Sequence, residues 1–123
     1  MSAAAKDDAG KPVRLGVIGV GIMGSNHARV LAELGGVKVV GIADPGAAHR
    51  ELLGQILSCA VCNDADALLD LGIDAAVIAA PTHLHHDIAL TCIRRGVHVL
   101  VEKPIASNVE EGRAIVAAPN VPA

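Results

Sequence analysis

The chain has 123 residues, enough for one domain of ordinary size with a single hydrophobic core. Hydrophobic residues make up 52% of it and charged residues 19%, a balance that excludes an intrinsically disordered protein. The net charge of −3 gives no basic field, so we expect no nucleic-acid partner. No run of about 18 apolar residues occurs, so we expect no membrane partner either.

Residues 1–12 mix alanines with charged residues and lack the apolar stretch of a secretory signal. We expect them to form a flexible tail in front of a single domain over 13–123. Without an export signal, the expected compartment is the cytoplasm.

Beyond the tail, short apolar runs alternate with segments of helical spacing, which is the pattern of βαβ units. Strands are predicted over 13–19, 37–43, 59–62, 74–80 and 97–101. Helices are predicted over 22–34, 47–57, 84–95, from a cap at Asn63 or Asp64 to 71, and from a capping box at 107–110 to about 117. Right-handed crossovers then give an α/β fold, a doubly wound parallel sheet of Rossmann type with strand order 3-2-1-4-5.

Cys59 and Cys62 form a C-x-x-C pair, a spacing that occurs in redox and metal sites. Both lie in a predicted strand, where positions three apart point to opposite faces. Thiols on opposite faces make a poor chelate, so we interpret both as small buried hydrophobic residues. Cys92 is interpreted as packing within a helix.

A G-x-G-x-x-G loop, Gly19 to Gly24, lies between the first predicted strand and the first helix. Gly19 makes the tight turn, Gly21 lets the backbone approach a pyrophosphate, and Gly24 lets helix and strand pack closely. The helix N-terminus, with Ile22 and Met23 in its first turn, supplies N–H donors to the phosphates. The loop therefore predicts a dinucleotide site.

Asp44 lies 20 residues after Gly24, at the end of the second predicted strand. Its carboxylate is placed to accept hydrogen bonds from the adenosine ribose and to repel a 2′-phosphate, which favours NAD over NADP. Two alternatives remain open: a plain glycine turn with Asp44 as a turn residue before Pro45, and an FAD or nucleotide-only site.

Two further motifs follow the fourth and fifth predicted strands: 79–82 (AAPT), with His85 four residues beyond Pro81, and Glu102-Lys103-Pro104. Together with the glycine loop and Asp44, they resemble the glucose–fructose oxidoreductase / inositol dehydrogenase family over 13 to about 117. The resemblance implies an NAD-dependent dehydrogenase that transfers hydride between the nicotinamide and a sugar, polyol or nucleotide-sugar substrate.

The resemblance also implies roles for these residues. Pro81 and Thr82 lie against the cofactor with His85 beside them, Glu102 packs at the nicotinamide side, and Lys103 is the catalytic residue. A lysine at the carboxyl end of a strand can polarise a carbonyl or help an alcohol lose its proton. The alternative for Lys103 is a solvated charge paired with Glu102.

The remaining histidines carry no assigned role. His83, His85 and His86 resemble a metal cluster, but the start of a helix makes one three-histidine site awkward, and no metal is expected. His27, His49 and His98 are interpreted as ordinary surface or packed residues.

The resemblance implies a second, mostly β domain that supplies the substrate pocket, and we expect these 123 residues not to contain it. Two alternatives to a dehydrogenase therefore stay open: a stand-alone NAD-binding module without turnover, and a truncated remnant. The apolar strand over 97–101 is predicted to remain a sheet edge, which favours self-association or a partner chain.

Overall fold

The computed structural model describes residues 10–119; positions 1–9 of the expected tail and residues 120–123 lie outside the described part. Five parallel strands form one sheet in the order β3-β2-β1-β4-β5, as predicted. The strands are β1 (Val13–Ile18), β2 (Val37–Ala43), β3 (Ala60–Cys62), β4 (Ala75–Ile78) and β5 (His98–Val101). The chain therefore has the doubly wound α/β fold that the alternating pattern indicates.

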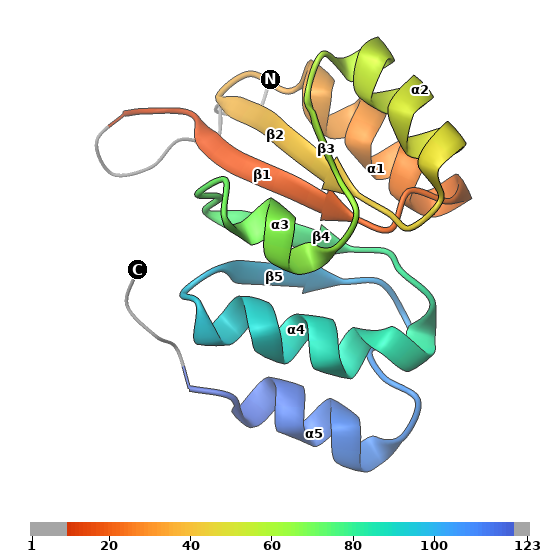
Figure 1. The fold of residues 1–123 in the computed structure, drawn as a ribbon. Coiled ribbons are helices and arrows are strands. Elements are labelled where there is room, and N and C mark those ends of the chain that lie inside the picture. The colour runs from red at the N-terminus through yellow and green to blue at the C-terminus, as the bar shows by residue number, and fades with distance from the viewer. Residues whose placement is uncertain (1–9, 120–123) are drawn as a thin grey trace.

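Helices cover both faces of this sheet (Figure 1). They are α1 (Ile22–Glu33), α2 (Ala47–Leu57), α3 (Ala65–Leu69), α4 (His85–Arg94) and α5 (Val109–Ala117), with a short 3-10 turn over Thr82–Leu84. One face carries α1 and α2, the other carries α3 and α4, and α5 packs beside α4. Among the described residues, no helix is long and apolar enough to cross a bilayer.

Two hydrophobic clusters fill the space between sheet and helices, because successive strand residues point to opposite faces. Val17 and Ile42 belong to the cluster beneath α1 and α2. Their neighbours Ile18 and Ala43 belong to the larger cluster beneath α3 and α4. This near-continuous apolar pattern is what a parallel sheet covered on both faces requires.

The cysteines follow the same alternation. Cys62 is buried in the larger cluster, whereas Cys59 packs against the cluster on the other face. Burial raises the pKa of both thiols and raises the pKa of Cys92 to about 11. The thiols therefore stay protonated at neutral pH, and they serve as small hydrophobic residues, as the strand pattern predicts.

Several element boundaries differ from the sequence-based prediction. The predicted capping box places the start of the last helix at Ser107, but the N-cap is Asn108, whose side chain accepts from the Glu111 N–H at 2.9 Å. Asn caps as well as Ser does, so the pattern did not fix the register. Asp64, not Asn63, caps α3, which ends at Leu69.

Candidate functional site

The predicted motifs lie side by side because backbone hydrogen bonds continue past the ends of the strands. The Gly19 N–H donates to the Ala43 carbonyl at 2.8 Å, next to Asp44. The Ala79 N–H donates to the Ile18 carbonyl at 2.8 Å, and the Glu102 N–H to the Ile78 carbonyl at 3.0 Å. The carboxyl ends of β1, β2, β4 and β5 thus form one edge, which is where open α/β sheets bind ligands.

The three glycines of the loop differ in what a side chain at each position would contact. Gly19 has a φ of +88°, and a Cβ there would lie 2.4 Å from the Ala80 nitrogen. At Gly24 a Cβ would lie 1.7 Å from the Gly19 carbonyl oxygen, so helix and loop could not close. A Cβ at Gly21 would meet nothing within 4 Å. Gly21 therefore leaves open space on the outer side of the loop, where a pyrophosphate would approach.

Asp44 is fixed at the end of β2 by two backbone donors. One carboxylate oxygen accepts from the Val20 N–H at 2.9 Å and the other from the Gly46 N–H at 2.8 Å. The Arg50 side chain donates to the Asp44 carbonyl at 2.8 Å. Each carboxylate oxygen has a second lone pair, so Asp44 can still accept from a ribose hydroxyl.

A hollow of about 520 Å³ opens beside Asp44. Of the predicted cofactor residues, Gly19, Asp44 and Pro81 line it. The rest of its wall includes three further aspartates and several apolar side chains: Asp64, Asp66, Asp87, Ile18, Leu84 and Ile88. The hollow thus has apolar and acidic residues in its lining, a combination that suits an adenosine and opposes an additional phosphate.

The other predicted cofactor residues lie outside this hollow. Ile22 is 84% exposed and Met23 is 53% exposed at the start of α1, next to the loop. Thr82 is half-buried and begins the 3-10 turn that precedes α4. All three remain predicted contacts for the pyrophosphate and nicotinamide parts of a dinucleotide.

His85 lies at the start of α4 and is buried there. Its side chain is 1% exposed, and its ring lies between two carbonyl groups of the protein. Nε2 is 2.7 Å from the Ala80 oxygen and Nδ1 is 3.0 Å from the Pro104 oxygen. The ring therefore joins the loop after β4 to the segment after β5, beneath the predicted cofactor site.

Glu102 is partly buried, and its carboxylate contacts Nε2 of His27 on α1. The hydrogen bond from His27 is the main reason that the pKa of Glu102 lies below its ordinary value, and the backbone N–H and charge of Lys103 lower it further. Lys103 itself is exposed, and its peptide bond to Pro104 is cis. The Glu102 carboxylate, which His27 holds, is thus followed in the chain by the exposed side chain of Lys103.

Sequence reasoning missed two residues of α1 at this edge. Ser25 donates from Oγ to the Val20 carbonyl at 2.8 Å and lies 3.0 Å from Nε2 of His49. His27 holds Glu102 although 75 residues separate them. Their position just after the glycine loop was the available signal, since the first turns of that helix lie at the carboxyl edge.

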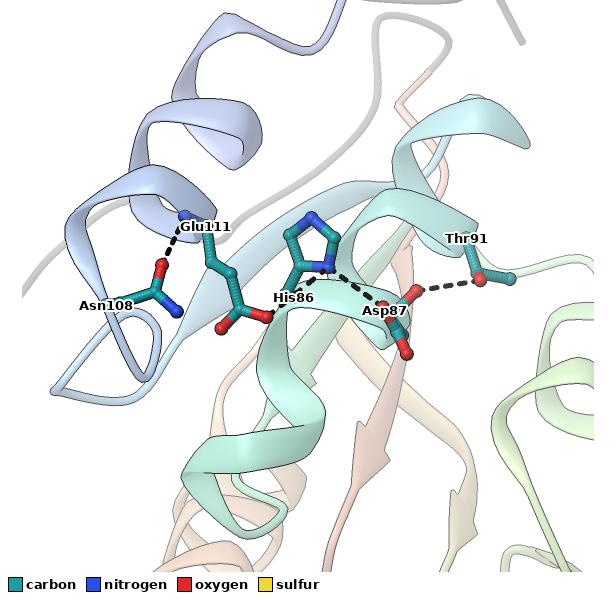
Figure 2. A network of polar contacts seen from close by, with 5 residues as sticks. All are labelled: His86, Asp87, Thr91, Asn108 and Glu111. Atoms are coloured by element: carbon teal, nitrogen blue, oxygen red, sulfur yellow. Dashed lines mark hydrogen bonds and ion pairs between the residues drawn. The ribbon is translucent and has the colours of Figure 1, made fainter.

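The neighbouring histidines do not gather around one point. His86 lies between Asp87 at 2.8 Å and Glu111 at 3.9 Å and so connects α4 to α5 (Figure 2). His85 points into the interior instead. Within residues 10–119, no group of three or more His, Cys, Asp or Glu side chains has a metal-binding arrangement.

A family model described as "Oxidoreductase family, NAD-binding Rossmann fold" matches residues 13–120. The chain belongs to this oxidoreductase family. The resemblance expected from the glycine loop, Asp44 and the Glu-Lys-Pro motif is thereby confirmed, and so is NAD as the cofactor of the fold.

Sugar and polyol dehydrogenases are among the proteins to which this chain is similar. Inositol 2-dehydrogenase 1 from Saccharopolyspora erythraea is 35% identical over 109 residues, which cover 85% of this chain and 32% of the relative. The scyllo-inositol dehydrogenase from Lactobacillus casei, solved with NAD(H) and scyllo-inositol, superposes with a TM-score of 0.81 at 26% identity over 85% of this chain and 32% of that one. The WlbA dehydrogenase from Bordetella pertussis, solved with NADH and UDP-GlcNAcA, gives 0.81 at 28% identity over 88% and 34%.

The chain therefore spans about a third of the length of the relatives that it matches. The described residues fit the family's cofactor. The open space at Gly21 can admit a pyrophosphate, and the fixed carboxylate of Asp44, which lines the hollow, can accept from an adenosine ribose.

Proposed function

We propose that this chain is the cofactor-binding part of an NAD-dependent dehydrogenase that acts on a sugar, polyol or nucleotide sugar. The observation that carries the proposal is the joining of the glycine loop, Asp44 and the Glu102-Lys103-Pro104 segment into one edge by backbone hydrogen bonds. The relatives that share this domain are sugar and polyol dehydrogenases.

In this proposal the chain's residues bind and orient the dinucleotide. The N–H groups at Gly21, Ile22, Met23 and Gly24 face the pyrophosphate, and Asp44 accepts from the adenosine ribose. The other aspartates that line the hollow add to the repulsion of a 2′-phosphate, which supports NAD over NADP.

Hydride chemistry belongs to the nicotinamide, and the protein's part is orientation and proton transfer. Pro81 and Thr82 would lie against the cofactor, with the buried His85 contacting the Ala80 carbonyl of the same loop. The Lys103 ammonium would hydrogen-bond the reacting oxygen of the substrate and take part in moving its hydroxyl proton. Glu102 would keep a negative charge beside that ammonium.

Binding of NAD without turnover is the second candidate function. It is favoured by one observation: the hollow beside Asp44 is lined by predicted cofactor residues but not by Lys103. Substrate positioning supplies much of the rate of such reactions, and a bound dinucleotide alone does not provide it.

We also propose that β5 pairs with a second copy of this chain or with a partner chain. Its only neighbour in the described sheet is β4, and Leu100 is 57% exposed. An apolar hollow of about 740 Å³, lined by Ile105, Val109 and Val116 among others, lies on the adjoining segment and α5.

We place the protein in the cytoplasm, a setting that suits its three free cysteines.

Calorimetric titration of NAD, NADH and NADP into the purified chain tests the cofactor proposal. We expect saturable NAD binding, weaker NADP binding, and a loss of affinity of at least about tenfold, or 1.4 kcal/mol, in Asp44→Ala. Asp74→Ala serves as the control, because Asp74 immediately precedes β4 at the opposite end of the sheet and its carboxylate likewise accepts from a backbone N–H, that of Arg14. Absence of NAD binding at millimolar concentration would replace the proposal by the remnant alternative.

An assay of NAD reduction with a panel of sugars, inositols and nucleotide sugars separates the two candidate functions. Turnover that Lys103→Ala abolishes supports the dehydrogenase. NAD binding without turnover of any member of the panel supports the binding module.

A further inference from the structure

The segment from Glu102 to Pro104 carries the proposed catalytic lysine, and contacts from three other elements hold it. The Glu102 N–H donates to the Ile78 carbonyl at the end of β4. The Glu102 carboxylate contacts His27 of α1, and the Pro104 carbonyl contacts His85 of α4. Lys103 thus lies between two residues that are each bonded to a histidine.

The contact at Pro104 comes from a buried ring. A carbonyl oxygen only accepts, so each ring nitrogen of His85 bonds its partner when it carries a hydrogen. The two partners belong to different loops: Ala80 precedes Pro81, and Pro104 follows Lys103. A neutral imidazole carries a hydrogen on only one of these nitrogens, so it donates to one carbonyl at a time, and the tautomer with Nδ1–H is the one that bonds Pro104. Because a buried polar ring is costly to leave unbonded, His85 stays packed between the two loops.

The contact at Glu102 comes from the glycine-loop helix. His27 lies three residues after Gly24, and its side chain is 30% exposed while that of Glu102 is 23% exposed. Because α1 begins at the glycine loop, this contact sets the distance between the proposed pyrophosphate site and Lys103.

We propose that His27 and His85 are positioning residues that hold Glu102 and Pro104 and thereby fix the backbone of Lys103 against the glycine loop and Pro81. The proposal rests on the proposed function, because that function makes Lys103 the group that needs positioning. Neither histidine is assigned a direct contact with substrate. Their effect is orientation, on which catalysis by a placed side chain depends strongly.

Backbone ¹⁵N relaxation of the Glu102 and Lys103 amides tests the proposal on the chain itself, without turnover. In the wild type both amides should have order parameters near 0.85, the value of rigid backbone. We expect values below about 0.6 in His27→Leu and in His85→Leu. His27→Gln, which keeps an N–H donor for the Glu102 carboxylate, should restore the rigid value.

His98→Gln is the matched control, because His98 is an exposed histidine of β5, the strand that leads into the segment. It should leave both order parameters at the wild-type value. Should His85→Leu fail to fold, the comparison of His27→Leu with His27→Gln decides by itself. Rigid amides in His27→Leu, or no restoration by His27→Gln, would overturn the proposal.

The same samples distinguish this inference from the proposed function. NADH titration of the wild type reports whether the cofactor site forms, whereas relaxation reports only how the segment is held. If the leucine variants have mobile amides but the wild type does not bind NADH, the proposed function is wrong. The histidine contacts are then structural restraints only. Positioning of Lys103 for catalysis is supported when the wild type binds NADH and the leucine variants loosen the segment.

Discussion

At the scale of single residues, two glycines of the loop serve different purposes: Gly24 allows the helix to pack against the loop, and Gly21 leaves room for the ligand. Gly24→Ala should destabilise the free protein by at least about 2 kcal/mol, because its Cβ would overlap the Gly19 carbonyl. Gly21→Ala should leave the free protein's stability within about 1 kcal/mol, because its Cβ has open space. NAD affinity should nevertheless fall at least about tenfold in Gly21→Ala, since the methyl group occupies the pyrophosphate's approach.

Urea unfolding of both variants and calorimetry of Gly21→Ala provide the measurements. An equal loss of stability in the two variants would contradict the steric difference between the positions. Unchanged NAD affinity in Gly21→Ala would mean that the pyrophosphate does not approach the loop there.

Glu102 supplies a pH-dependent contribution to stability. Its pKa is lowered in the folded state, chiefly by the hydrogen bond from His27, so the folded protein binds this proton less readily than the unfolded chain does. The contribution is therefore present above the ordinary value of 4.5 and is lost as the pH falls through the lowered pKa.

Comparison of Glu102→Gln with the wild type tests this sign. The difference in their free energies of unfolding should be largest near neutral pH and should shrink as the pH falls below 4.5. Glu33→Gln, at the exposed far end of α1, is the control. A difference that grows toward acid pH would show that the His27 contact does not stabilise the ionised carboxylate.

At the scale of elements, the position of the last helix cap can be measured directly. Asn108→Ala should destabilise the protein by about 1 kcal/mol, because its side chain accepts the Glu111 N–H. Ser107→Ala, one residue earlier and exposed, should have almost no effect. Thermal unfolding of the pair decides between the two registers, and a larger cost at Ser107 would restore the predicted capping box.

The sequence predicted the strand order and the meeting of the motifs, because apolar alternation and crossover handedness act over whole elements. It did not predict Asn108 as the N-cap of α5, since Ser107 and Asn108 stand side by side and either satisfies the local rule. The contacts of His27 and His85 depend on side chains from distant elements. No local pattern encodes such pairs, so only the folded arrangement reveals them.

At the scale of the whole molecule, exposed apolar side chains lie on the helices at both ends of the sheet, and at the β5 end they accompany an edge strand. Leu100 on β5 is 57% exposed, and Val109 and Val116 on α5 are 67% and 78% exposed. Because no strand of residues 10–119 pairs with the outer side of β5, this end of the molecule resembles an interface more than a solvated surface.

Substitution of Leu100 tests whether the β5 edge pairs with another chain. If β5 pairs with a second copy, the weight-average mass from light scattering should rise with concentration in the wild type and stay at the monomer value in Leu100→Lys, because a charge on an edge strand opposes pairing. Leu52→Lys is the matched control: Leu52 is 59% exposed on α2, on the other face and near the other end of the sheet. It should associate as the wild type does. A wild-type mass that stays monomeric at high concentration would remove self-association, and β5 would then be the docking edge for a different chain.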